Sequence, residues 1–173
     1  MEPNLSEITA ILASTPDTVR ALLAGLPEPW LDTRESEGTF SPRDVLGHLI
    51  HGEMTDWIPR LKRILESGES RAFDPFDRHG YRPAPGASIK HLLDEFATLR
   101  AANLATLKGL DLTPERLSLK GTHPVFGLVT LGQLLATWMV HDLNHVDQIV
   151  RVMSKRYDQT VGPWKEYLGI LNR

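Results

Sequence analysis

The stretch TLGQLLATWMVHDLNHVDQIVRVM, residues 130–153, decides the fold, because a helix start signal is followed by a long amphipathic repeat. Thr130 and Gln133 predict a capping box, in which each side chain binds the backbone N–H of the other residue. Beyond it, apolar residues recur at helical spacing and define an inward face: Leu131, Leu134, Leu135, Trp138, Ile149 and Val152. We expect one helix from residue 130 to about residue 157.

Three further segments have the same helical period, and none has the alternation of a strand. They cover about residues 5–26, 42–66 and 88–109. Pro16 is expected to kink or split the first, and Ser41 with Pro42 predicts the start of the second. Glycine and proline mark the connections as loops: residues 27–39, 67–87 and 110–129. The pattern predicts an all-α four-helix bundle with a short extra helix at about residues 164–171, and the long second and third connections allow a crossover topology.

The composition excludes several classes of protein. The 173 residues include no cysteine, which excludes disulfides, thiolate metal ligands and a cysteine nucleophile. The formal net charge of −3, from 19 basic and 22 acidic residues, offers no basic surface for nucleic acid or an anionic membrane. The first ten residues lack a signal-peptide pattern, and no apolar run approaches the roughly 18 residues that span a bilayer. We expect one domain, residues 1–173, in the cytoplasm.

His141 and His145, in the motif HDLNH, are the most informative polar residues. A spacing of four places both imidazoles on one helix face, where they can chelate one divalent metal. At roughly 100° per residue, the helical wheel puts His145 inside the apolar arc and His141 at its edge. Asp142 falls near the middle of that arc, where a carboxylate is unfavourable unless it is paired. We interpret Asp142 as part of a buried salt bridge; orienting a ligating imidazole is the alternative.

A third metal ligand would come from the second predicted helix, but the residues do not identify it. The wheel does not select His48, which lies beyond Val45 on the polar side of that helix. His51 lies nearer to Ile58, on the other flank. The third ligand therefore stays open between these two histidines and Glu53.

Three segments resemble the DinB-like (YfiT-like) family of metal-binding bundles: SPRDVLGHLIHGE from residue 41, HPVFGLVTLGQLL from residue 123 and HDLNHVDQI from residue 141. The resemblance covers nearly the whole chain, and its most specific part pairs V-L-x-H-L with H-x-x-x-H-x-x-Q. It implies a four-helix bundle that binds a divalent cation through three histidines. On this sequence those histidines are His48, His141 and His145, while Glu53 and Gln148 become candidates for groups that support the ligands.

The resemblance also implies a chemistry. Three imidazoles without a thiolate leave positions open for water or substrate. Zinc and nickel are the metals we most expect, and iron and manganese are also compatible with imidazole ligands. Members of the family with assigned activity include thiol-dependent transferases and isomerases, and others are described as metal-dependent hydrolases. The expected function is a metal-dependent transferase or hydrolase that acts on a small molecule, with a low-molecular-weight thiol as a candidate partner.

Two interpretations compete with an enzyme. In the first, the bundle is a non-catalytic module that binds a metal or ligand structurally or serves in protein interaction. A coordination sphere closed by His51 or Glu53 would favour that module. In the second, no metal is bound, each imidazole is hydrogen-bonded to a carboxylate or carbonyl, and the rings do not converge.

Two further expectations concern the surface of the bundle. Residues 67–87 form a long loop, which we interpret as a solvated loop with Phe73 and Phe76 as aromatic anchors. A lid over the metal site is the alternative. Near the C-terminus, several large apolar side chains exceed what one small bundle needs in its interior: Trp138, Trp164, Tyr167 and Leu168. Exposed aromatic residues often mark interfaces, so we expect a homodimer.

Overall fold

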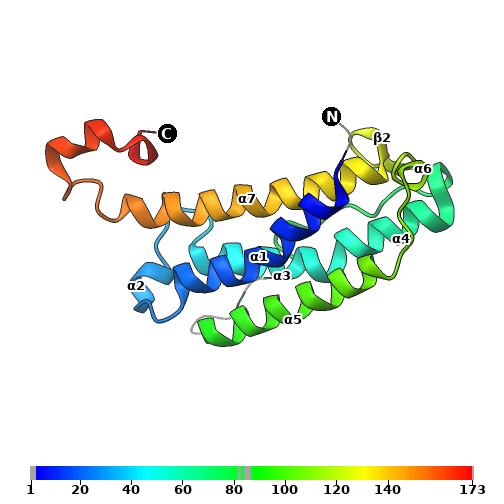
Figure 1. Ribbon diagram of the computed structural model, residues 1–173. Helices are drawn as coiled ribbons and strands as arrows, with labels where there is room; N and C mark the ends of the chain where they lie inside the picture. The colour runs from blue at the N-terminus through cyan, green and yellow to red at the C-terminus, as the bar shows by residue number, and fades with distance from the viewer. Residues whose placement is uncertain (1–2, 82, 84–86, 173) are drawn as a thin grey trace.

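The computed structural model describes residues 3–81, 83 and 87–172. Four long helical units form the all-α bundle predicted from the sequence (Figure 1). The α-helices are α1 Leu5–Leu23, α2 Glu28–Leu31, α3 Pro42–Thr55, α4 Trp57–Ser67, α5 Ile89–Lys108, α6 Pro114–Leu117 and α7 Leu131–Lys155. The other elements are two strands, β1 Lys120–His123 and β2 Gly127–Thr130, and three 3-10 segments, η1 Gly68–Ser70, η2 Gly162–Tyr167 and η3 Gly169–Leu171.

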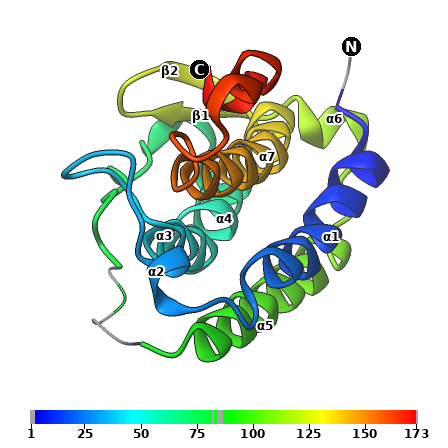
Figure 2. The same ribbon diagram turned by 90° about the vertical axis from the view of Figure 1, so that its left-hand side faces the viewer.

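The helical units do not follow chain order around the bundle. Helix α1 packs against α5 and α7, and α3 packs against the same two helices, so α1 and α3 lie diagonally opposite (Figure 2). The first and third connections therefore cross the bundle, whereas the second joins the neighbouring units α3–α4 and α5. The length of a connection therefore does not predict whether it crosses the bundle, because the second connection is long and does not cross.

A β-hairpin interrupts the third connection, where the sequence analysis expected only a loop. Strands β1 and β2 pair antiparallel, with His123 opposite Gly127. The Nδ1 atom of His123 accepts the backbone N–H groups of Val125 and Phe126 at 3.1 and 3.2 Å and so stabilises the turn. Gly127 adopts φ 73°, a conformation that favours glycine. Each strand has only four residues, which is too short for alternation to stand out in the sequence.

The predicted helix over residues 42–66 is two helices, α3 and α4, that meet at Asp56. Pro59 explains the break, because proline has no N–H for the carbonyl four residues earlier and its ring clashes with that carbonyl. The carbonyl concerned belongs to Thr55, the last residue of α3. Asp56 forms an ion pair with Arg60 at 2.6 Å across the junction.

Helix α1 runs through Pro16 as one continuous helix, so this proline does not split it. Proline removes the N–H that would bind the carbonyl of Leu12. That carbonyl instead accepts a 2.7 Å hydrogen bond from Nη1 of Arg100, on α5. A side chain from another helix therefore satisfies the group that Pro16 leaves without a partner.

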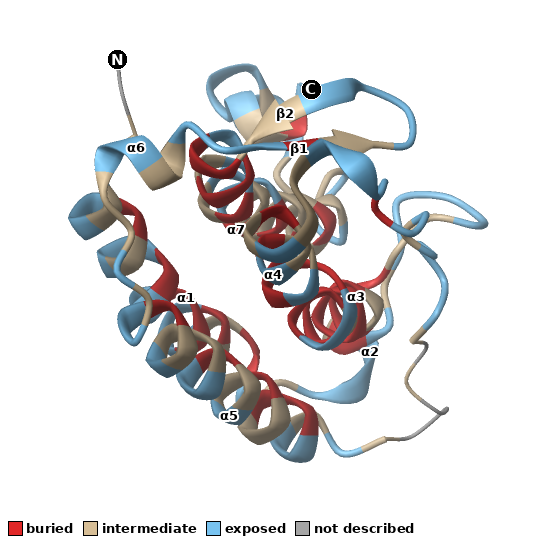
Figure 3. Cartoon of the chain, turned by 90° about the vertical axis from the view of Figure 1, so that its right-hand side faces the viewer, coloured by how far each residue is buried: buried red, intermediate tan, exposed pale blue. Residues whose placement is uncertain are grey.

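Buried residues occur on all four helical units (Figure 3). The apolar ones form two clusters. The cluster nearer the hairpin includes Leu12, Leu61, Leu107, Leu135 and Trp138. The cluster at the other end includes Val19, Leu49, Leu92, Phe96 and Ile149. A buried polar layer separates the two apolar clusters. Its central residues, Glu53, Arg100 and Asp142, are buried on α3, α5 and α7.

The guanidinium of Arg100 holds this polar layer together. Its Nη1 and Nη2 atoms bind Asp142 at 2.6 and 3.0 Å, and Nη2 binds Glu53 at 2.8 Å. Glu53 also accepts hydrogen bonds from Asn103 at 2.9 Å and from the indole N–H of Trp138 at 3.0 Å. The side chains of Arg100, Glu53 and Asp142 are each 1 % exposed. The predicted buried salt bridge of Asp142 is confirmed, and its partner is Arg100.

The C-terminal segment differs from the prediction in two ways. Residues 164–171 form parts of two 3-10 segments, η2 and η3, rather than an α-helix, and they lie beyond the end of α7 (Figure 1). Trp138 is fully buried, so it does not contribute to an exposed aromatic surface as expected. Trp164 and Tyr167 are 70 % and 82 % exposed. Within the described residues, no helix is both long enough and apolar enough to span a membrane.

We predict that Arg100→Met lowers the free energy of unfolding by about 3–5 kcal/mol, because it leaves two buried carboxylates without their cation. Urea denaturation monitored by tryptophan fluorescence would measure the loss. Arg20→Met is the control: it also removes an arginine–aspartate pair, with Asp94, but solvent screens that pair. A loss for Arg100→Met no larger than that for Arg20→Met would contradict the prediction.

Candidate metal centre

The start of α3 places His48 at the site. Ser41 and Asp44 form a capping box, and Pro42 occupies the first turn, so the helix begins at a defined residue. Gly47 allows Pro83 to approach closely, because a Cβ at position 47 would lie 2.6 Å from Cδ of Pro83. His48 is thereby enclosed and only 8 % exposed.

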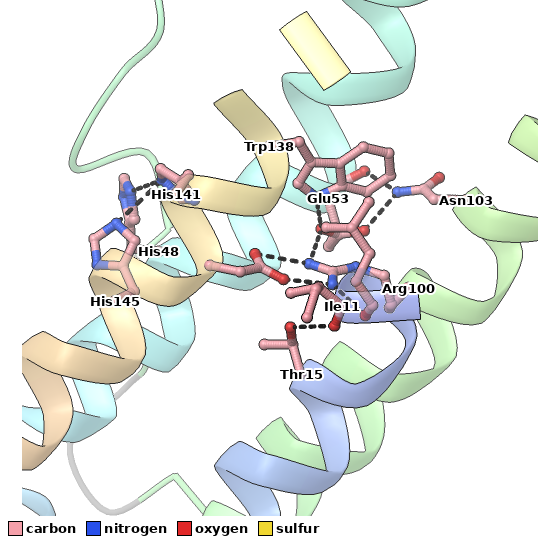
Figure 4. Close-up of polar contacts among 11 residues, drawn as sticks. Ile11, Thr15, His48, Glu53, Arg100, Asn103, Trp138, His141 and His145 are labelled. Atoms are coloured by element: carbon pink, nitrogen blue, oxygen red, sulfur yellow. Dashed lines mark hydrogen bonds and ion pairs between the residues drawn. The ribbon is translucent and has the colours of Figure 1, made fainter. Parts of the chain in front are cut away.

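Three imidazoles converge between α3 and α7 (Figure 4). The Nε2 atom of His141 lies 3.1 Å from Nε2 of His48 and 3.1 Å from Nε2 of His145. One ring nitrogen from each of the three residues lies within 4.8 Å of the others. The ring of His48 therefore faces the other two, although 93 residues separate it from His141 in sequence.

Aromatic side chains surround the three imidazoles. Trp57 packs edge-on against His141 at 5.0 Å between ring centroids, and Phe76 packs edge-on against His48 at 5.4 Å. Phe40 lies 5.8 Å from the His48 ring on another side. This lining keeps water from much of the cluster, which strengthens electrostatic interactions within it.

Burial keeps the three rings neutral. Loss of solvation, with smaller contributions from His145 and His48, lowers the pKa of His141 to about 2. The same cause, with a contribution from His145, lowers the pKa of His48 to about 4. Burial also lowers the pKa of His145, although hydrogen bonding to Gln148 and the charge of Asp142 oppose the shift. Metal ligation needs neutral imidazole, so the cluster is in the ligating form at neutral pH.

The arrangement fits a divalent cation. Two nitrogens bound to one metal at about 2.0–2.1 Å lie roughly 2.8–3.4 Å apart for angles near 90–110°, and two of the Nε2 separations are 3.1 Å. Oε1 of Gln148 lies 2.8 Å from Nδ1 of His145, so this amide oxygen accepts the Nδ1 proton and leaves the Nε2 lone pair directed at the cluster. The Nδ1 atoms of His48 and His141 are buried without a hydrogen-bond partner among the described residues, so no contact of Nδ1 determines which nitrogen of these two rings carries the proton.

The other candidates for a third ligand do not join the cluster. Glu53 points to the other side of α3, where it binds Arg100 and Asn103 (Figure 4). His51 packs against Phe76 at 5.1 Å between ring centroids, and its Nε2 lies 3.5 Å from the Thr55 hydroxyl. The alternatives left open by the wheel are thus separated by the structure, which brings together His48 and the pair on α7.

Sequence reasoning missed Arg100 and the packing of Phe40 and Trp57 against the imidazoles, although it named Phe76 as an aromatic anchor. Arg100 follows Phe96 by four residues and so lies on the apolar stripe of α5, which was a usable signal. The carboxylate that needs a buried cation is Asp142, which lies on the apolar arc of α7. Phe40 and Phe76 come from connecting segments, whose positions relative to α3 follow only from the folded chain.

A scan against protein-family models matches residues 11–149 to the DinB superfamily. The chain belongs to this family. Among solved structures, the DinB-like bundle is similar to YfiT from Bacillus subtilis, described as a probable metal-dependent hydrolase with an unusual four-helix bundle topology. The two share 22 % identity with a TM-score of 0.74, over 87 % of this chain and 86 % of YfiT, which supports a common fold. A search of curated proteins found no match.

The neutral buried histidines predict that the metal-free protein loses stability in mild acid. An unfolded histidine has a pKa near 6.5, above the lowered folded values, so the unfolded chain binds more protons below that pH. The stabilisation is complete above about pH 6.5 and is lost as the pH falls toward the folded pKa values. Each histidine contributes up to about 1.4 kcal/mol per pH unit.

Urea denaturation between pH 7.5 and 5, with a chelator present, would measure this dependence. His141→Leu is expected to remove about one proton from the linkage, whereas His91→Ala, at an exposed position on α5, should leave the slope unchanged. Equal slopes for the wild type and His141→Leu would mean that His141 is not buried in its neutral form.

Proposed function

We propose that this protein is a divalent-metal-dependent enzyme whose metal is held by His48, His141 and His145. The observation that carries the proposal is the convergence of three neutral imidazoles, with two Nε2 separations of 3.1 Å. We propose a hydrolase or a thiol-dependent transferase acting on a small molecule. The description of YfiT as a probable metal-dependent hydrolase supports the first, and the family resemblance supports the second.

The residues have separate tasks in this proposal. The three histidines bind the metal, and Gln148 keeps the proton of His145 on Nδ1. The rings of Phe40, Phe76 and Trp57 limit access of water. When bound, the metal supplies Lewis acidity, which polarises a substrate group or makes a hydroxyl or thiol more acidic. Zinc and nickel are the proposed metals, and iron and manganese also suit imidazole ligands.

The number of protein ligands favours an enzyme over a structural metal site. Structural zinc sites are closed by four protein ligands, whereas catalytic sites keep a position open. Among the described residues, only three histidines, and no carboxylate, meet at the cluster. The non-catalytic module would be favoured by a fourth ligand, and both candidates for that role, His51 and Glu53, have other contacts. The interpretation without a metal required imidazole rings that point away from one another. The rings of the three histidines instead converge.

We predict that protein purified without a histidine tag binds one divalent ion per chain. Replacing any of the three histidines by alanine should weaken binding by more than about 100-fold, because even the supporting partners of metal ligands contribute 10–100-fold. Isothermal titration with Zn²⁺ or Ni²⁺ would measure the affinity. A metal concentration 100 times the Kd should stabilise the folded state by about 2.7 kcal/mol.

His51→Ala is the matched control, since it removes an imidazole from the same helix outside the cluster. Its metal affinity should equal that of the wild type. A wild-type protein without stoichiometric metal, together with unchanged stability in His145→Ala, would contradict the proposal.

We also propose that the protein forms a homodimer through its exposed C-terminal aromatic residues, Trp164 and Tyr167. Light scattering after size exclusion should then give about twice the chain mass of 19.4 kDa. The double variant Trp164→Ser/Tyr167→Ser should shift the equilibrium to the monomer. A wild-type species of 19.4 kDa at all concentrations would refute the dimer. We also propose a cytoplasmic location, because a sequence without cysteine suits a reducing compartment.

A further inference from the structure

A small cavity lies beside the histidine cluster. It encloses about 220 Å³, and its lining includes Arg34, Phe40, Asp44, Arg78, His79 and Tyr81. Phe40 is a shared wall, because its ring lies 5.8 Å from the ring of His48 and 5.9 Å from that of His79. Asp44 precedes His48 by four residues on α3, which corresponds to a rise of about 6 Å along the helix. The cavity and the cluster are therefore adjacent.

Most polar groups that line this cavity already have partners. Arg34 forms an ion pair with Asp44 at 2.6 Å, so their charges largely cancel. The Tyr81 hydroxyl donates a hydrogen bond to Glu95 at 3.0 Å. Arg78 differs, since it forms no ion pair with any residue that the structure describes. Arg78 is exposed, so its guanidinium is accessible to a ligand from solvent.

We infer that this cavity binds the anionic end of a small organic substrate through Arg78, with the reactive end of that substrate at the three histidines. The inference rests on the proposed function, because the histidines mark where the substrate reacts. A guanidinium binds a carboxylate with two parallel hydrogen bonds, which fixes the orientation as well as the position of the ligand. The two guanidinium groups of the lining outnumber its one carboxylate, so the cavity favours an anion over a cation.

The size of the cavity narrows the class of substrate further. Pockets for drug-sized ligands usually enclose about 300–1,000 Å³, so 220 Å³ suits a molecule of only a few carbons. Phe40 borders both the cavity and His48, so one small molecule can reach the cavity and the cluster together. The substrate class is therefore a short-chain carboxylate whose reactive group lies at the other end of the chain.

Two hydroxamates of equal chain length test this inference on the cobalt-loaded protein. Both succinic acid monohydroxamate and butyrohydroxamate bind a metal through the hydroxamate, but only the first carries a carboxylate at its far end. The visible absorption of bound Co²⁺ reports binding of either probe. We expect the wild type to bind the carboxylate probe about tenfold more tightly than the neutral one.

Arg78→Gln should reduce this preference to about onefold without changing the affinity for the neutral probe or for Co²⁺. Arg78→Lys, which keeps the charge but loses the bidentate geometry, should retain part of it. Arg71→Gln is the control, since it removes an exposed arginine of the same loop that lines a different surface hollow; its preference should equal that of the wild type.

The outcomes separate this inference from the proposed function. If Co²⁺ binds but the preference is absent in the wild type, or persists in Arg78→Gln, the anion site is wrong and the metal site stands. If the wild type does not bind Co²⁺ at the histidines, the proposed function fails and the substrate assignment fails with it. A preference that is lost equally in Arg71→Gln and Arg78→Gln would indicate general electrostatic attraction and would also overturn the inference.

Discussion

The arrangement of this bundle depends on the hydrogen bonds that the guanidinium of Arg100 donates. From α5 it binds the Leu12 carbonyl on α1, Glu53 on α3 and Asp142 on α7, so one side chain contacts all four helical units. Apolar side chains tolerate small sliding movements between helices, whereas hydrogen bonds of 2.6–2.8 Å to buried charges do not. Buried ion pairs contribute less to net stability than their number suggests, but they are well suited to fixing helix register.

The register fixed by Arg100 also determines the geometry of the histidine cluster. Glu53 follows His48 by five residues on α3, and Asp142 directly follows His141 on α7. A slip of α7 by one residue would translate it by about 1.5 Å and turn its faces by about 100°. Such a slip would separate both the salt bridge and the imidazoles. The polar layer and the candidate metal centre are thus opposite sides of one α3–α7 contact.

The sequence predicted the parts of this protein that depend on periodicity and local chemistry. The bundle and the bounds of α5 and α7 follow from apolar spacing and capping residues. The spacing of four residues also predicts that His141 and His145 lie on one face of α7. The wheel failed for His48, because it assumes that the only buried face is the one toward the bundle core. In the structure, the segment around Phe76 and Tyr81 packs over α3 and buries a second face. Only the family resemblance could select His48 before that packing was known.

A proline within an amphipathic period breaks the helix at Asp56 but leaves α1 continuous. Both Pro16 and Pro59 lie within amphipathic periods, and each removes one backbone donor. Near Pro16 the unpaired carbonyl of Leu12 meets Arg100 from another helix, whereas α3 ends at Thr55, and Asp56 turns the chain into α4. A proline's effect therefore depends on a tertiary partner that the local sequence does not contain.

Electrostatics explains why a cation suits this part of the bundle despite the arginines near it. Glu53, Arg100 and Asp142 together carry one net negative charge on the inner side of the α3–α7 contact, where the low dielectric preserves its effect. Burial prevents the histidines from meeting that charge by taking up protons near neutral pH. A divalent ion can bind neutral nitrogens without displacing protons, and it then interacts favourably with the carboxylates behind them. The same burial that makes the imidazoles poor bases thus keeps them available as ligands.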